Sequence, residues 1–121
     1  MARYRVSRQA RGDLARILAT SAQTWGEEGR RRYAALLAAA MRRAASDPEG
    51  RMTRDRSELL HGLRSLHLRY VRVDDPPDRV KRPVHCLYYR PIEPGLIEII
   101  RVLHERMDPT LHLDVARPRD A

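Results

Sequence analysis

The sequence predicts an α+β domain in which an N-terminal strand and a helical hairpin precede a three-strand antiparallel meander. Apolar residues recur every three or four positions over residues 8–46, which is the period of an amphipathic helix. The period changes to two over residues 65–103, which is the period of a strand. The 121 residues fit one domain. We expect that domain at residues 1–114, followed by a charged, flexible tail at residues 115–121.

The first element is a short strand at residues 3–7, with Tyr4 and Val6 on one face. Ser7 can then cap a helix, because a serine hydroxyl accepts hydrogen bonds from the backbone N–H groups of the first turn. The apolar stripe of that helix consists of Ala10, Leu14, Ile17, Leu18, Ser21 and Trp25. Since Trp25 continues the stripe, we expect it to pack between this helix and the next one.

A second helix is predicted to begin at Thr24, because Thr24 and Glu27 have the spacing of a capping box. Its apolar stripe consists of Tyr33, Leu36, Leu37, Ala40, Met41 and Ala44. The helix ends at Asp47, because Pro48 disfavours helical geometry in the residue before it. Two such helices with almost no link between them form a helical hairpin, which can cover one face of a sheet.

Three strands and a short helix complete the predicted domain. The strands are expected at residues 65–70, 84–90 and 96–103, after a polar loop at 51–58 and with turns at 74–78 and at Pro94-Gly95. In the first of them Leu66, Leu68 and Tyr70 alternate with polar residues, so this strand is half-buried. Asp108 and Pro109 favour a short C-terminal helix, as its cap and first residue.

The strand at residues 96–103 is the most apolar one, which is typical of the centre of a sheet. A strict period of two divides its apolar residues into Ile97, Ile99 and Leu103 on one face and Leu96, Ile100 and Val102 on the other. By the same argument Arg101 shares the face of Leu103, and His104 lies on the opposite face.

Basic residues outnumber acidic ones by 24 to 16, which gives a formal net charge of +8 and predicts an anionic partner. The single cysteine, Cys86, excludes an intrachain disulfide framework. Five histidines without paired ligand spacing favour no metal site, and without a glycine-rich phosphate loop no cofactor is expected. No apolar run reaches the length of a membrane span, so we expect a cytoplasmic protein.

Three stretches stand out beside this element order. They are Trp25-Gly26, Gly62-Leu63-Arg64-Ser65-Leu66 and the block Arg101-Val102-Leu103-His104-Glu105-Arg106-Met107-Asp108, which His112-Leu113 follows. Together with the order of elements, they resemble the ParE branch of the RelE/ParE toxin superfamily over residues 4–113. The link at residues 74–83 is long for that family and predicts an extended hairpin.

The resemblance implies the toxin of a type II toxin–antitoxin pair. It implies that the chain inhibits DNA gyrase by binding, without covalent chemistry of its own. It also implies a cognate antitoxin, whose acidic segment suits the basic chain and with which the toxin forms a hetero-oligomer. The alternative, implied by the RelE branch of the same superfamily, is a ribosome-dependent endoribonuclease that cuts messenger RNA.

A ribonuclease needs a base, an acid and cations for the phosphate. The candidate side chains for those roles are Arg64, Tyr88, Arg90, Arg101 and His104. Because Arg101 and His104 are expected on opposite faces of one strand, they are not expected to form a catalytic pair. This placement favours the binding toxin.

A separate set of residues is expected to contact the partner. These residues are Arg64, Leu66, Leu68, Tyr70, Arg101, His104 and Arg106. Leu66, Leu68 and Tyr70 are either anchors for the antitoxin or covered by the helical hairpin, and the sequence favours neither. For Arg64, contact with an anion and packing within the domain are equally expected. For His104 the favoured role is a hydrogen bond that holds the C-terminal segment at the end of the strand.

Overall fold

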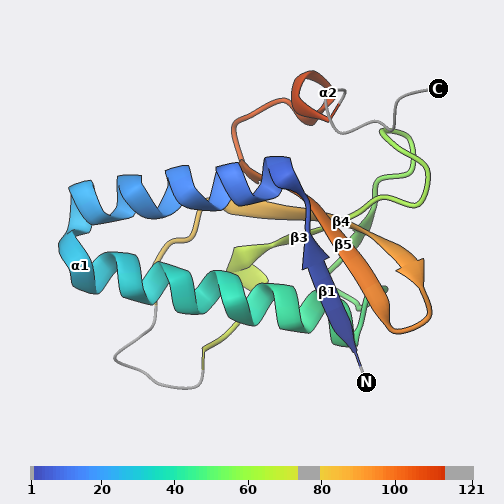
Figure 1. The fold of residues 1–121 in the computed structure, drawn as a ribbon, viewed down its shortest axis with the longest axis horizontal. Helices are drawn as coiled ribbons and strands as arrows, with labels where there is room; N and C mark the ends of the chain where they lie inside the picture. Colours follow the sequence, from blue (N-terminus) through green and yellow to red (C-terminus); the bar gives the residue numbers. More distant parts are fainter. Residues whose placement is uncertain (1, 74–79, 114–121) are drawn as a thin grey trace.

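The computed structural model of the chain describes residues 2–73 and 80–113, and it has the α+β architecture that the sequence predicts (Figure 1). The elements in chain order are β1 (Arg3–Val6), α1 (Arg8–Ser46), β2 (Arg54–Asp55), β3 (Arg64–His67), the 3-10 turn η1 (Leu68–Tyr70), β4 (His85–Glu93), β5 (Leu96–His104) and α2 (Pro109–His112). The turn predicted at residues 74–78 and the tail predicted at residues 115–121 lie outside the described residues.

The strands form one five-stranded sheet in the order β1-β5-β4-β3-β2. The predicted meander is confirmed, because β3, β4 and β5 pair antiparallel in succession. The N-terminal strand β1 pairs parallel with β5, the last strand of the chain. The polar loop expected at residues 51–58 contributes one more strand, since Arg54 and Asp55 pair with the start of β3.

The predicted helical hairpin is also confirmed. Gly26 interrupts α1 with φ 77° and ψ −174°, a conformation that only glycine adopts readily. The first arm (residues 8–25) and the second arm (residues 27–46) run back along each other (Figure 1). The predicted capping box is wrong: Thr24 still belongs to the first arm, and the carboxylate of Glu27 accepts hydrogen bonds from Arg30 instead.

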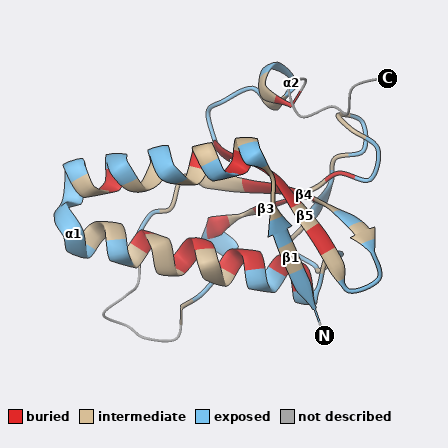
Figure 2. Cartoon of the chain, viewed as in Figure 1, coloured by how far each residue is buried: buried red, intermediate tan, exposed pale blue. Residues whose placement is uncertain are grey.

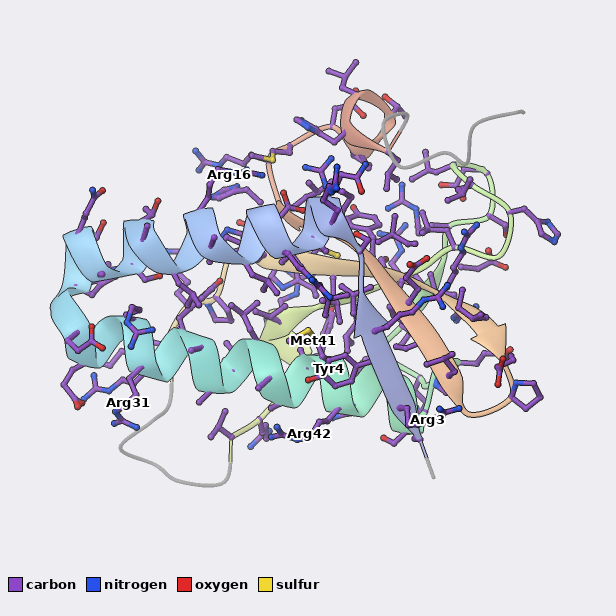
Figure 3. All side chains as sticks on the ribbon, in the orientation of Figure 1. Arg3, Tyr4, Arg16, Arg31, Met41 and Arg42 are labelled. Carbon is purple, nitrogen blue, oxygen red and sulfur yellow. The ribbon has the colours of Figure 1, made fainter. Side chains whose placement is uncertain are left out.

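The main core lies between the hairpin and one face of the sheet. The six residues of the stripe predicted for the second arm are all buried: Tyr33, Leu36, Leu37, Ala40, Met41 and Ala44 (Figure 2). They pack with side chains from three strands, among them Leu66, Leu87 and Ile99. Tyr4 of β1 packs against the same cluster, to which Met41 of α1 belongs (Figure 3). Burial of this apolar surface is the main favourable contribution to the stability of the fold.

A β-bulge in β5 changes which side chains share a face. Tyr88 pairs with Arg101 and Tyr89 pairs with Ile99, so Ile100 is one extra residue in the strand. Val102 therefore joins Ile97 and Ile99 in the core beneath the hairpin, contrary to the prediction from a strict period of two. Ile100 lies with Leu103 on the other face, in a smaller cluster that consists of Leu63, Tyr88, Ile100, Leu103 and Leu113.

The strand predicted at residues 65–70 ends earlier than expected. β3 stops at His67, whose Nδ1 accepts a hydrogen bond from the backbone N–H of Arg69 over 3.0 Å. This contact caps η1, in which the N–H of Val71 bonds to the carbonyl oxygen of Leu68 over 3.0 Å. The local side-chain hydrogen bond competes with the strand ladder and turns the chain away from it.

The predicted packing of Trp25 is wrong. Its side chain is 74% exposed at the tip of the hairpin, where the burial colours are those of an exposed surface (Figure 2). Ser21 is the last residue of the first arm that is buried, so the tip extends past the core. The predicted C-terminal helix is confirmed as α2, and Asp108 caps it by accepting a hydrogen bond from the N–H of Thr110 over 3.0 Å.

Candidate functional site

A groove of about 990 Å³ lies between the tip half of the hairpin and the end of the sheet. Its walls come from residues 13–33 of α1, residues 80–85 before and in β4, and residues 101–107 at the end of β5, with His112 at the side. We call this feature the tip groove. It exists because the two arms continue past the last strand that supports them, which leaves their inner faces uncovered.

The tip groove combines apolar walls with two large exposed apolar side chains. Ile17, Val80 and Val102 contribute to its walls. Trp25 from the hairpin and Met107 from the segment after β5 also border it, and Met107 is 46% exposed. Exposed tryptophan and methionine beside a groove are typical of protein–protein contact surfaces.

The charge in the tip groove is mainly positive. Its cationic side chains are Arg16 (Figure 3), Arg32, Lys81, Arg82 and Arg101. Against these five cations stand two carboxylates, Asp13 and Glu28. The groove is thus complementary to an anionic ligand.

Asp13 and Arg101 form a buried ion pair at one end of the groove. One oxygen of Asp13 accepts from Nε of Arg101 (2.8 Å) and from the backbone N–H of Val102 (2.9 Å). The other oxygen accepts from Nη2 of Arg101 (2.8 Å) and from Arg16 (2.6 Å). Nη1 of Arg101 donates to the carbonyl oxygen of His112 over 2.7 Å. This cluster connects α1, β5 and α2, and the hydrogen bond to Asp13 raises the pKa of Arg101.

Two histidine rings lie together on the sheet side of the groove. His85 and His104 are opposite each other in the β4–β5 pair, with ring centroids 5.5 Å apart. Nδ1 of His85 lies 2.6 Å from the hydroxyl oxygen of Tyr33. That oxygen accepts a hydrogen bond from the backbone N–H of Val84 over 3.2 Å. Burial, followed by the neighbouring His104, lowers the pKa of His85 to about 4, so that His85 is neutral at pH 7.

The nuclease candidates do not converge on one place. Arg101 and His104 border the tip groove, whereas Arg64 and Arg90 border a second pocket of about 440 Å³. Tyr88 is buried in the small cluster on the face of the sheet away from the hairpin, with the guanidinium of Arg56 6.0 Å from its ring centroid.

The residues expected to contact a partner are equally dispersed. Leu66 and Leu68 are buried under the hairpin, which was one of the two placements that the sequence left open. Tyr70 is partly exposed and lies under the guanidinium of Arg69, 5.0 Å away.

Arg64 and Arg106, two basic members of that set, have different environments. Nε of Arg64 donates to the carbonyl oxygen of Pro48 over 3.0 Å, and its Nη2 donates to Thr53 over 2.8 Å. Arg106 is exposed. Its backbone N–H donates to Nδ1 of His104 over 3.1 Å, which is the kind of hydrogen bond predicted for His104.

Several residues of the tip groove were missed in the sequence. They are Asp13, Arg16, Lys81, Arg82 and His85. Asp13 had a recognisable signal, because it lies three residues after Ala10 and four before Ile17, inside the apolar stripe of the first arm. A carboxylate at such a position is buried only with a partner. The cations had no comparable signal, since arginine occurs throughout the chain.

Comparison with known proteins gives consistent matches over most of the chain. The family model described as "ParE toxin of type II toxin-antitoxin system, parDE" matches residues 4–109. The chain is 32% identical over 106 residues to Toxin ParE1 of Mycobacterium tuberculosis, in strain CDC 1551 / Oshkosh and in strain ATCC 25618 / H37Rv. Each match covers 88% of this chain and 92% of the relative.

The described residues also bear on two other classes of site. Over residues 2–73 and 80–113, no three His, Cys, Asp or Glu side chains are grouped so that they could hold a metal ion. Within the same ranges, neither helix has a stretch long and apolar enough to cross a membrane.

Proposed function

The chain belongs to the ParE toxin family of type II toxin–antitoxin systems, and from this premise we propose that it inhibits DNA gyrase by binding and is neutralised by a cognate antitoxin in the tip groove. Membership makes it a toxin with an antitoxin partner. The target and the mode of neutralisation are our proposal. It places the protein in the cytoplasm, in a hetero-oligomer with the antitoxin until it is released.

The observation that carries the antitoxin site is the composition of the tip groove. An amphipathic segment can place its apolar face on Ile17 and Val102 and cover Trp25 and Met107. Acidic residues on its flanks would then meet the cations of both walls. Aromatic and arginine side chains account for most of the binding energy in typical interfaces, and the groove offers both.

The dispersion of the nuclease candidates supports action by binding. A ribonuclease holds its base, its acid and its phosphate-binding cations within hydrogen-bond reach of one substrate. Here Arg64 and Arg90 lie at a different pocket from Arg101 and His104. The guanidinium of Arg101 is also engaged by Asp13 and by the carbonyl of His112. We therefore keep message cleavage as the alternative and gyrase as the proposed target.

A supercoiling assay with purified gyrase tests the proposal. The toxin alone should inhibit supercoiling and leave cleaved DNA trapped on the enzyme, and prior addition of the antitoxin should abolish both effects. Absence of inhibition at micromolar toxin, together with cleavage of ribosome-bound message in a parallel reaction, would instead establish the nuclease alternative.

The antitoxin part of the proposal has its own test. Removal of the acidic segment of the antitoxin should weaken or abolish the complex, and higher salt should mainly slow association. Affinity that is fully retained without that segment would contradict the groove as the neutralising site.

A further inference from the structure

We propose that His85, His104 and Arg32 form a carboxylate-binding subsite in the tip groove, which accepts an aspartate or glutamate side chain of the antitoxin. This inference rests on the proposed neutralisation and deepens it, because it specifies which groups of the groove recognise the acidic partner. All three side chains border the groove.

The hydrogen bonds of the two rings determine which nitrogen carries the proton. The hydroxyl of Tyr33 accepts from the N–H of Val84, so its own hydrogen is available for Nδ1 of His85, 2.6 Å away. The backbone N–H of Arg106 donates to Nδ1 of His104 over 3.1 Å, so this nitrogen is also an acceptor. A neutral imidazole has one acceptor and one donor nitrogen. His104 therefore presents Nε2–H as its donor, and His85 does the same in the tautomer in which Tyr33 donates to its Nδ1.

These two donors have no acceptor within the part of the chain that the structure describes. The nearby carboxylates are already engaged. Asp13 accepts from Arg101 and Arg16, and Glu105 accepts from Nε2 of His67 over 2.7 Å. The subsite thus has donors in excess, which an incoming carboxylate can satisfy because each of its oxygens accepts two hydrogen bonds.

Arg32 provides the second, independent observation. It precedes Tyr33 on the second arm, and its Nε is buried without a hydrogen-bond partner among the described residues. A buried donor without an acceptor carries a free-energy penalty, and a ligand oxygen would relieve it. Arg16, Lys81 and Arg82 add positive charge to the same groove. Apolar walls and the exposed Trp25 favour the carboxylate of a protein over the phosphate of a nucleic acid.

The subsite also predicts proton uptake on binding. The groups that face His85 are Tyr33 of α1 and His104 of β5, and His67, Glu105 and Asp13 are further charged or titratable neighbours. The cations that border the same groove are Arg16, Arg32, Lys81 and Arg82. A bound carboxylate favours the charged imidazole, so the pKa of His85 is higher in the complex than in the free toxin, where burial and His104 lower it. The affinity should therefore increase as the pH falls from the higher pKa of His85 in the complex toward its value of about 4 in the free toxin, by up to about tenfold per pH unit for the one proton taken up.

Paired substitutions of His104 separate recognition from structure. Asparagine places an acceptor where Nδ1 was and removes the Nε2–H donor, whereas glutamine places its amide near Nε2 and loses the Nδ1 acceptor. His104→Asn should weaken binding of the full-length antitoxin, measured by isothermal titration calorimetry at pH 7, by about tenfold or more. His104→Gln should stay within about threefold of the wild type. The pair His85→Asn and His85→Gln repeats the comparison at the second ring. It keeps the test decisive if one of the His104 variants does not fold.

The outcomes distinguish this inference from the proposed function. If all four variants bind the antitoxin like the wild type at every pH, the subsite is refuted and neutralisation in the groove stands. Weaker binding by the glutamine variants than by the asparagine variants would show a structural role and also refute it. If the wild-type toxin does not bind the antitoxin, both proposals fail. Competition by a 20-base-pair DNA duplex, weakened by the same asparagine variants, would assign the subsite to phosphate and overturn it.

Discussion

Replacement of Asp13 by asparagine should be among the most destabilising single substitutions in this chain. Asp13 is only 3% exposed, and its two oxygens accept four hydrogen bonds, three of them from guanidinium groups. Asparagine keeps one acceptor oxygen and directs an NH₂ group at the guanidinium of Arg101, so that a donor faces a donor. Arg101 then remains as a buried cation without a counter-charge.

The expected loss in the free energy of unfolding is about 3–5 kcal/mol, the typical cost when one partner of a buried ion pair is removed. A domain of this size has about 5–15 kcal/mol in total. The Tm should fall by roughly 10–25 °C, since each kcal/mol corresponds to about 3–5 °C at this chain length. Urea unfolding followed by circular dichroism measures the change directly.

Two controls make the Asp13 result specific. Arg16→Gln removes the exposed member of the cluster, whose side chain is 69% exposed, and should cost less than about 1 kcal/mol. The double variant Asp13→Leu/Arg101→Met should be more stable than Asp13→Asn, because no buried charge is left unpaired. Two results would contradict the role of the ion pair. One is a cost of less than about 1 kcal/mol for Asp13→Asn. The other is a loss of unfolding free energy in the double variant that equals the sum of the losses in Asp13→Leu and in Arg101→Met.

Three further predictions concern His85, the hairpin turn and the hairpin tip. Because His85 takes up a proton near pH 6.5 when unfolded and near pH 4 when folded, stability should fall as the pH is lowered from 6.5 to about 4, and urea midpoints of His85→Asn should lack this part of the pH dependence. Gly26→Ala should cost about 1–3 kcal/mol, because its φ of 77° strains any residue with a Cβ, even though an added Cβ meets nothing within 4 Å. Gly12→Ala inside the first arm should be neutral or stabilising by up to about 1 kcal/mol. Equal effects of the two substitutions on the unfolding free energy would refute the backbone argument. Trp25→Ala should leave the Tm nearly unchanged and weaken antitoxin binding by about tenfold or more. As the control, Leu111→Ala removes an equally exposed side chain (73%) outside the tip groove and should bind the antitoxin normally. A similar loss of affinity in Trp25→Ala and Leu111→Ala would exclude a specific contact by Trp25.

Periodicity was sufficient for the elements that bury one continuous face. The stripe of the second arm is buried as predicted, because all its side chains follow one helical period and face the same core between the hairpin and the sheet. The strands at β4 and β5 were also located within a few residues. A bulge has no such signal: an extra residue at Ile100 reverses the faces after it, although the composition of the strand gives no indication of it.

The site was harder to predict than the fold, for a physical reason. The tip groove arises where α1 continues beyond the sheet, and this depends on the relative lengths of elements and not on any motif. Trp25 lies on the apolar stripe but has no opposite surface to pack against, so periodicity predicted burial where the structure has exposure. Arg101 and His104 were selected as candidates by the resemblance, and they border the groove for different reasons. Arg101 is held by Asp13, whereas His104 is held by the backbone at Arg106.

The parallel pairing of β1 with β5 has a consequence for synthesis. Arg5 of β1 and Glu98 of β5 are opposite each other in the sheet, but 93 residues separate them in the chain (Figure 1). At about 5–20 residues per second, a ribosome needs roughly 5–20 s to add that segment. During this interval the hairpin lacks β5, so Ile97, Ile99 and Val102 do not yet cover its apolar face. A nascent chain of this toxin therefore completes its sheet, and with it the tip groove, only after β5 has been synthesised.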